Sequence, residues 1–195
     1  FKDENFSLVF IDRETDKLQC DTVIVDGMSA TKQAVSILIE KGHRKIGYIK
    51  GLAGLSTSND RFLGYAEALQ EHGIEVDESL VYCGDSRRES GYGLCLRLLK
   101  DKEVTAMYVS NNLMAVGAMQ CLADQDVKIP EQMAIIGFDD YNWATITNPP
   151  LSTIKQPTGE LGAKAARLIV ERIENPDAPY KKHIFAAEFI QRKSC

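Results

Sequence analysis

The sequence has no long hydrophobic run and no excess of positive charge. Its 195 residues carry 23 Lys and Arg against 28 Asp and Glu, which gives a formal net charge of -5. A domain that grips DNA usually presents a basic face, because neutralising phosphates supplies much of the affinity. This chain is therefore not expected to bind DNA by itself. No apolar stretch approaches the ~20 residues that a membrane-spanning helix needs, so no membrane association is predicted.

The sequence has only five cysteines, an odd number, and their spacing matches no recognisable motif. None of the five cysteines forms a C-x-x-C pair of the kind found in zinc or redox sites. Cys95 and Cys121 lie among apolar residues and are predicted to be core residues. This usage fits the reducing cytoplasm. The polar start Phe1-Lys-Asp-Glu-Asn predicts no signal peptide, and a first residue other than Met suggests a fragment.

Catalytic and cofactor motifs are also missing. The three histidines, His43, His72 and His183, form no H-x-x-x-H ligand pair. There is no G-x-S-x-G nucleophile motif. The glycines Gly51 and Gly54 follow a predicted strand but match neither the dinucleotide nor the P-loop pattern. We therefore predict no catalytic residues, no metal and no cofactor.

What the sequence does contain is an alternation of strand and helix patterns. Strands are predicted at 7–11, 22–25, 45–49, 80–82, 105–109, 133–138, 151–154 and 184–190. Helices are predicted at 29–41, from 57 or 58 to 73, and at 89–100, 113–123 and 158–174. Repeated βα units predict an α/β fold with mostly parallel sheets flanked by helices.

Polar side chains follow the predicted strands, where parallel sheets bind their ligands. A carboxylate can accept hydrogen bonds from vicinal hydroxyls and an arginine can donate in a rigid fork, so the set suits a polyhydroxylated ligand. Capping of the next helix is the alternative for each residue, and we favour it for Asn112 and Asp140. The residues are Asp12, Asp26, Arg61, Asn111, Asn112, Asp139, Asp140 and Gln156.

Five segments in order resemble the effector-binding domain of the LacI/GalR family of bacterial transcription regulators. Each segment alone is moderately specific, and their order makes the resemblance strong. They are 42–49 (GHRKIGYI), 59–65 (NDRFLGY), 110–117 (SNNLMAVG), 136–140 (IGFDD) and 149–154 (PPLSTI), with Gln156 two residues later.

The resemblance implies a fold like the type I periplasmic binding proteins, in which two Rossmann-like lobes close on a small ligand. It assigns 1–25 and 155–183 to a partial N-terminal lobe, and 26–154 and 184–195 to the C-terminal lobe. It also implies a homodimer and an N-terminal helix-turn-helix head, absent from this chain, that reads operator DNA. The effector would change operator affinity by favouring one of two states.

Ligand residues are carried over by position from the family. They are Asp12, Thr57, Arg61, Asn111, Asp139 and Gln156. Ser86 stands where relatives often have a stacking aromatic residue, and Trp143 is a second candidate to face the ligand. Candidate dimer-interface residues are Met114, Ala118, Met119, Pro149 and Pro150, with ordinary core packing as the alternative for the first three.

The sequence thus predicts the effector-binding and dimerisation domain of a sugar-responsive, cytoplasmic transcription repressor that is not an enzyme. An exported sugar-binding protein of a transporter is the main alternative, because it would share the fold. An enzyme on a doubly wound sheet is a third possibility, disfavoured by the missing nucleotide fingerprint.

Overall fold

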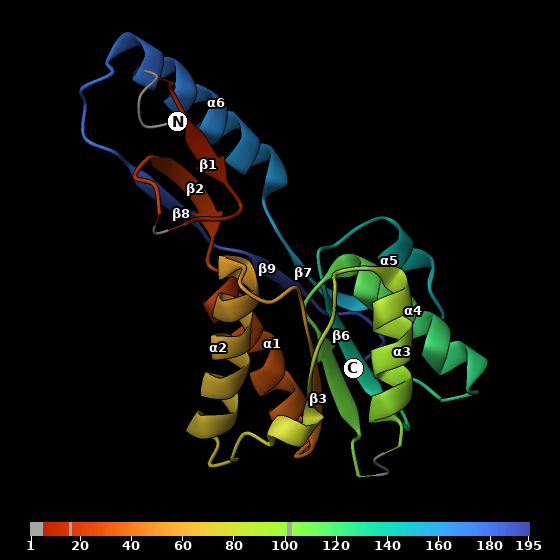
Figure 1. Ribbon diagram of the computed structural model, residues 1–195. Coiled ribbons are helices and arrows are strands. Elements are labelled where there is room, and N and C mark those ends of the chain that lie inside the picture. Colours follow the sequence, from red (N-terminus) through yellow and green to blue (C-terminus); the bar gives the residue numbers. More distant parts are fainter. Residues whose placement is uncertain (1–5, 16, 101–102) are drawn as a thin grey trace. The chain divides into compact units, whose positions relative to one another are not determined.

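The computed structural model describes residues 6–15, 17–100 and 103–195 (Figure 1). Residues 1–5, part of the predicted N-terminal lobe, lie outside the described residues. The chain forms two compact units, which are described separately. Unit 1 comprises Phe1–Asp26 and Gln156–Ala187, and unit 2 comprises Gly27–Lys155 and Glu188–Cys195.

Unit 2 is built on a six-stranded sheet with the strand order β4-β3-β5-β6-β7-β9. Five neighbouring strands run parallel, and β9 pairs antiparallel with β7. The central strands are buried along their whole length, as expected for a parallel sheet covered on both faces. The strands are β3 (Ile46–Lys50), β4 (Val81–Cys83), β5 (Ala106–Val109), β6 (Ala134–Phe138), β7 (Ser152–Lys155) and β9 (Glu188–Ile190).

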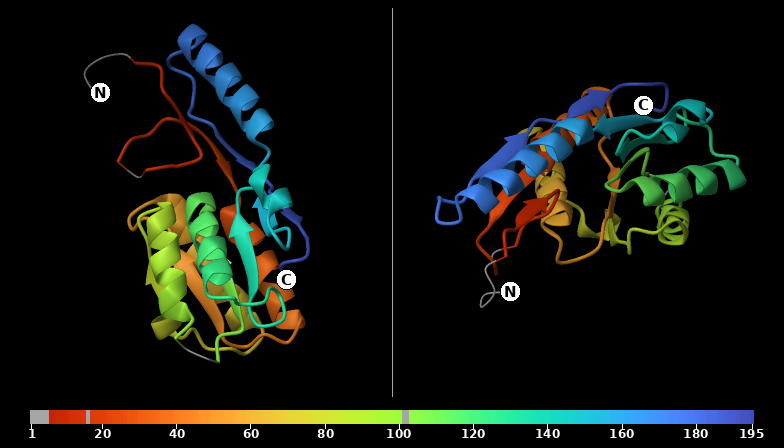
Figure 2. Two further views of the ribbon diagram at one scale, coloured as in Figure 1. Left: turned by 90° about the vertical axis from the view of Figure 1, so that its right-hand side faces the viewer. Right: turned by 90° about the horizontal axis from the view of Figure 1, so that it is seen from above.

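The helices of unit 2 pack in two pairs, α1 with α2 and α3 with α4. Figures 1 and 2 show the two pairs on opposite sides of the sheet. The helices are α1 (Gly27–Glu40), α2 (Ser56–Glu71), α3 (Arg88–Leu98), α4 (Asn112–Asp124) and the short α5 (Trp143–Ile146). A 3-10 turn, η1 (Glu78–Leu80), precedes β4.

Glycines allow both helix pairs to approach closely. A Cβ on Gly64 of α2 would collide with the backbone carbonyl of Met28 in α1. A Cβ on Gly117 of α4 would collide with the carbonyl of Arg88 in α3, and one on Gly91 with the backbone of Met114. Two of the family-like motifs therefore contain a glycine for helix packing, a role separate from ligand contact.

Unit 1 has a parallel three-stranded sheet with the order β1-β2-β8, packed against helix α6. Its elements are β1 (Val9–Ile11), β2 (Asp21–Val25), α6 (Thr158–Glu174) and β8 (Lys182–Phe185). Val23, Leu161 and Leu168 form its small apolar core. A buried ion pair adds to it, in which Arg172 Nε lies 2.8 Å from an Asp21 carboxylate oxygen.

The predicted fold class is confirmed, and α6 has the predicted bounds. The single strand predicted at 184–190 was wrong. Residues 182–185 form β8, which pairs with β2, whereas 188–190 form β9, which pairs with β7. A mostly apolar run, interrupted only by Glu188, hid the change of sheet. The helix predicted at 29–41 begins two residues earlier, at Gly27, so Ser29 lies inside α1 rather than at its start.

Candidate functional site

The predicted ligand residues of unit 2 follow neighbouring strands of one sheet. Ser86 follows β4, Arg61 lies on the helix after β3, Asn111 follows β5 and Asp139 follows β6. These four strands are adjacent and parallel, so their carboxyl ends share one edge. The topology thus brings together polar groups that are as much as 78 positions apart in sequence, from Arg61 to Asp139.

Arg61 is the most constrained side chain at this edge. Only 9% of the residue is exposed, and its guanidinium lies 3.5 Å from the centroid of the Phe138 ring. One terminal nitrogen, Nη1, donates a 2.7 Å hydrogen bond to the carbonyl of Ser110. The buried Nε atom has no hydrogen-bond partner among the described residues. Stacking and the carbonyl bond fix the plane of the guanidinium, while a donor remains for another group.

Ser110 organises this edge, a role that the sequence analysis did not assign. Its hydroxyl donates to the carbonyl of Ile49 and accepts from the backbone N–H of Gly51, both at 3.0 Å. Its own carbonyl holds Arg61. Ser110 therefore ties the end of β5 to the end of β3 and positions the guanidinium. A serine directly after a buried strand is the only sequence signal for this role.

Asn111 has a structural role of its own. Its side-chain oxygen accepts a 3.2 Å hydrogen bond from the Met114 backbone N–H, which makes it the N-cap of α4. The capping role expected of Asn112 was wrong, because Asn112 is the first helical residue. A ligand contact by Asn111 stays a prediction, and the amide nitrogen is the part of the side chain that capping leaves available.

The two aspartates after β6 differ in environment. Asp139 adopts a positive φ of 71°, an uncommon conformation outside glycine that aspartate tolerates better than most residues. Asp140 instead forms a two-point ion pair with Arg192, with distances of 2.6 and 3.0 Å, and accepts from Thr153. The capping role expected of Asp140 was therefore wrong: it anchors the residues after β9 to β7.

Opposing effects act on the Asp140 carboxyl. Burial raises its pKa, but hydrogen bonds from Arg192 and Thr153 favour the carboxylate more strongly, so the net pKa lies below the ordinary value of 3.8. Asp140 is thus ionised in the folded protein at neutral pH. Its role is to hold the segment that carries Asp139.

Arg61 and Asp139 act on the same buried hydroxyl. Tyr108 lies wholly within the protein, and burial raises the pKa of its phenol. A hydrogen bond with Thr31 and the charge of Arg61 lower this pKa, whereas the charge of Asp139 raises it. A cation and an anion therefore both act on this buried hydroxyl.

Three further candidates of unit 2 have distinct positions. Ser86 has a positive φ of 66°, and its hydroxyl accepts from the Leu52 N–H at 3.3 Å. Thr57 lies half-buried in the first turn of α2. Trp143 begins α5 and packs partly buried against the core, which favours the packing alternative over a ligand-facing ring.

Asp12 and Gln156 belong to unit 1. Asp12 follows β1 with a positive φ of 69°, and its backbone N–H donates to Val23. Gln156 follows β7 and precedes α6. Ligand contact by these two residues stays a prediction.

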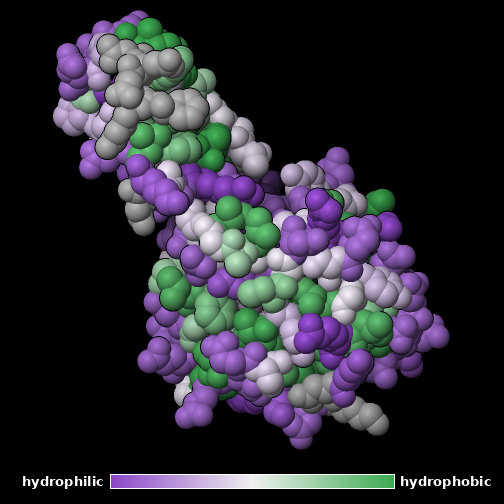
Figure 3. Space-filling view, viewed as in Figure 1, coloured by the Kyte–Doolittle hydropathy of each residue, from purple (hydrophilic) through white to green (hydrophobic). Residues whose placement is uncertain are grey.

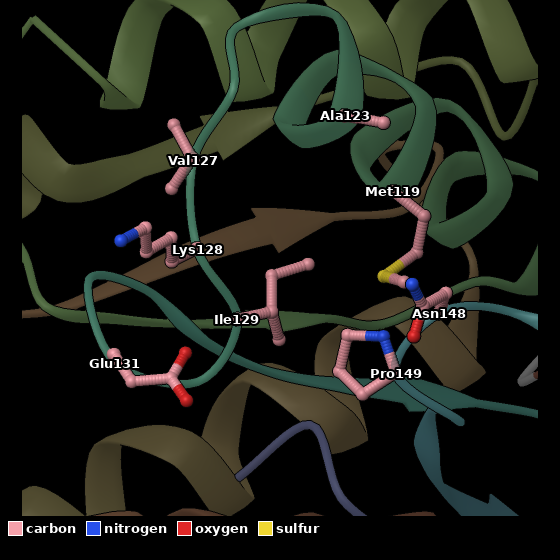
Figure 4. Close-up of a pocket in the computed structure, with 8 residues that line it drawn as sticks. All are labelled: Met119, Ala123, Val127, Lys128, Ile129, Glu131, Asn148 and Pro149. Atoms are coloured by element: carbon pink, nitrogen blue, oxygen red, sulfur yellow. The ribbon is translucent and has the colours of Figure 1, made fainter.

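The candidate interface residues separate into two groups. Met114 and Ala118 are completely buried in the core of unit 2, so they offer no surface to a second copy, and the core alternative holds. Met119 and Pro149 line a shallow surface pocket of about 290 Å³ between α4 and the loops that follow it (Figure 4). Pro150 lies beside this pocket in sequence and is half-buried.

On the face seen in Figure 3, hydrophilic residues dominate unit 2 and hydrophobic ones form scattered patches. In the ranges 6–15, 17–100 and 103–195, no cluster of His, Cys, Asp or Glu is placed to hold a metal ion. No helix of the described chain has the length and apolar character to cross a membrane.

Comparison with known proteins shows which family this chain belongs to. A family model described as periplasmic binding protein-like domain matches residues 35–195. A solved LacI-family sugar-binding transcriptional regulator from Escherichia coli, complexed with phosphate, is 32% identical, with a TM-score of 0.86 over 100% of this chain and 70% of that one. This chain belongs to the LacI-type, periplasmic binding protein-like effector domains.

Two other members of the family also match nearly all of this chain. The probable repressor ExuR of Bacillus subtilis is 30% identical over 194 residues, which is 99% of this chain and 58% of ExuR. The transcriptional regulator CelR, solved with cellobiose, is 32% identical with a TM-score of 0.90 over 96% of this chain and 58% of CelR. The chain thus spans little more than half the length of these LacI-type relatives, which are transcription regulators rather than enzymes.

Proposed function

We propose that this chain is the effector-binding region of a bacterial transcription repressor that responds to a sugar or a sugar derivative. The observation that carries the proposal is the Arg61 guanidinium, held over the Phe138 ring and bonded to Ser110, at the strand edge where Asp139 also lies. A rigid fork of donors near a carboxylate acceptor matches a pair of neighbouring sugar hydroxyls.

The ligand set of this proposal is Thr57, Arg61, Asn111 and Asp139 from unit 2, with Asp12 and Gln156 from unit 1. Hydrogen bonds to charged groups contribute about 1.5–3 kcal/mol each, so a few of them give micromolar affinity. The preformed plane of Arg61 lowers the entropy lost when the ligand binds. Trp143 and Ser86 are supporting candidates of lower weight.

Regulation requires that the effector bind one conformation of the regulator better than another. Operator DNA would be bound through a helix-turn-helix head outside this chain, since the net charge of -5 does not favour contact with phosphates. We propose a cytoplasmic homodimer, with the pocket lined by Met119 and Pro149 as the part of unit 2 that faces the second copy.

The experiment uses the intact protein and a panel of cellobiose, hexoses, hexuronates and sugar phosphates. A ligand that binds the native state raises the melting temperature by mass action. The same ligand should alter the affinity of the protein for operator DNA, measured by fluorescence anisotropy. A panel member that stabilises a protein without any operator affinity would support the exported binding protein instead. Turnover of a bound sugar would support an enzyme.

A further inference from the structure

Two thiols lie together in the core between α3 and α4, away from the edge that carries Arg61. Cys95 and Cys121 are both completely buried and belong to the same apolar cluster. Both are free thiols. Core packing explains why a small apolar side chain stands at each position, but it does not require that two cysteines face one another.

The geometry of the helix pair brings the two sulfurs together. Gly91 and Gly117 let the backbones of α3 and α4 approach closely, and each cysteine follows its glycine by four residues, about one turn on the same face. The Cys95 thiol donates to the carbonyl of Ala118 in α4 at 3.6 Å. Cys121 is the alternative acceptor for the same thiol proton.

This contact makes the two thiols unequal. The hydrogen bond with Cys95 favours the thiolate of Cys121 and lowers its pKa, against the opposing effect of burial. The same hydrogen bond, together with burial, raises the pKa of Cys95. Cys121 is therefore the better nucleophile of the two, and Cys95 is the partner that keeps its proton.

A polar contact lies one turn along the helices from the thiols. Tyr92, three residues before Cys95, bonds through its hydroxyl to Asp124, three residues after Cys121. Tyr92 is only partly buried. Because both sulfurs are completely buried, a small reagent reaches them only when this part of the helix pair opens locally.

We propose that Cys95 and Cys121 are a redox-active dithiol that a hydroperoxide converts to a disulfide joining α3 to α4. The Cys121 thiolate attacks one peroxide oxygen, the O–O bond breaks, and a sulfenic acid and hydroxide form. The sulfur of Cys95 then attacks the sulfenic sulfur, and its proton leaves with the hydroxyl as water. Overall, two thiols and one H₂O₂ give one disulfide and two waters, so the cysteines lose two electrons and the peroxide gains them.

This inference goes beyond the proposed function and does not depend on it. The disulfide would fix α3 against α4, and the N-cap of α4 is Asn111, at the edge that carries the candidate ligand residues. Reduction by a small dithiol restores the free pair. Peroxide thus becomes a second signal that acts on the same unit.

The test treats the intact protein with hydrogen peroxide, blocks remaining thiols after denaturation, and maps tryptic peptides by mass spectrometry. We expect peptide 89–97 to be joined to peptide 103–128 with the loss of two hydrogens, and dithiothreitol to separate them. The linkage should form to the same extent at all protein concentrations, because it is intramolecular.

Three single-cysteine variants complete the test. Cys83→Ser, at an exposed thiol outside the pair, should keep the linkage, whereas Cys95→Ser and Cys121→Ser should lose it. If the wild-type protein retains both core thiols in reduced form at a peroxide dose that oxidises Cys83, the proposal is wrong. Sulfinic acid on Cys121 without any linkage would also overturn it. Both of these results are read on the wild-type chain, so they hold even if a variant folds poorly.

Discussion

The carbonyl oxygen of Ser110 accepts a 2.7 Å hydrogen bond from Nη1 of Arg61. This bond joins a residue at the end of β5 to a helix that follows β3, its neighbour in the sheet. It turns a flexible side chain into a fixed part of the edge. Asp139, which follows β6, brings a carboxylate to the same edge.

Arg61→Ala and Asp139→Ala in the intact protein should each abolish the response to the effector, while operator binding persists. Each change removes charged hydrogen bonds to the ligand, worth about 1.5–3 kcal/mol apiece, which corresponds to at least a tenfold loss of affinity. Calorimetry with a ligand from the sugar panel measures this loss. Arg167→Ala, at an exposed arginine on α6, is the control. Unchanged ligand affinity in both variants would refute the assignment.

Asn111 allows its structural and ligand roles to be separated. Asn111→Ala removes the α4 cap and should lower the free energy of unfolding by about 1 kcal/mol. Asn111→Ser restores a capping oxygen and should recover that stability, but it lacks the amide nitrogen. Urea unfolding measures the first effect and ligand calorimetry the second. Full ligand affinity in Asn111→Ser would leave Asn111 as a cap only.

The motif glycines should prove essential for helix packing. Gly64→Ala and Gly117→Ala place a methyl group against a neighbouring helix backbone and should destabilise unit 2 by about 1–3 kcal/mol or more. Gly93 is a matched control, because a Cβ there meets no atom within 4 Å. Gly93→Ala should be neutral or stabilising by up to about 1 kcal/mol, since alanine favours the helix. Thermal and urea unfolding of the three variants compare these effects; equal losses at all three positions would contradict the packing argument.

The ion pair between Asp140 and Arg192 should appear in the pH dependence of stability. Because the pKa of Asp140 is lowered on folding, the pair adds stability above about pH 4, the ordinary range of an aspartate, and this stability is lost as pH falls below it. Arg192→Met should therefore reduce the free energy of unfolding at neutral pH and converge on the wild type in acid. Urea titrations from pH 7 to pH 2 test this. A constant gap across that range would mean that the pair contributes nothing.

Arg172 in unit 1 is the strongest candidate for a large loss of stability. It bonds to both carboxylate oxygens of Asp21 and to the carbonyls of Pro176 and Pro179. Arg172→Met leaves a buried carboxylate without its partner, which typically costs about 3–5 kcal/mol. Arg167→Met, on the exposed side of the same helix, should change stability by less than about 0.5 kcal/mol. Comparable effects of the two changes in urea unfolding would count against a special role for the pair.

Sequence patterns predicted most of the fold because buried parallel strands and amphipathic helices have strong periodic signals. They also placed Arg61, Asn111 and Asp139 at one edge, since the carboxyl ends of parallel neighbours must meet there. They did not predict contacts between residues that are far apart in the sequence. Nothing next to Asp140 in sequence indicates Arg192, and nothing near Phe138 indicates that Arg61 stacks on it. The full burial of Met114 and Ala118 likewise depends on how closely α3 and α4 approach.

The change of sheet between β8 and β9 has a consequence for how the protein is made. Each unit contains two segments of the chain, with breaks after Asp26, Lys155 and Ala187. Unit 1 lacks a strand until residue 185 has left the ribosome, and unit 2 lacks β9, Arg192 and Ser194 until a few residues later. Neither unit can complete the sheet described here while the chain is still growing through residues 27–155, so the two sheets receive their last strands almost together, as residues 182–190 emerge.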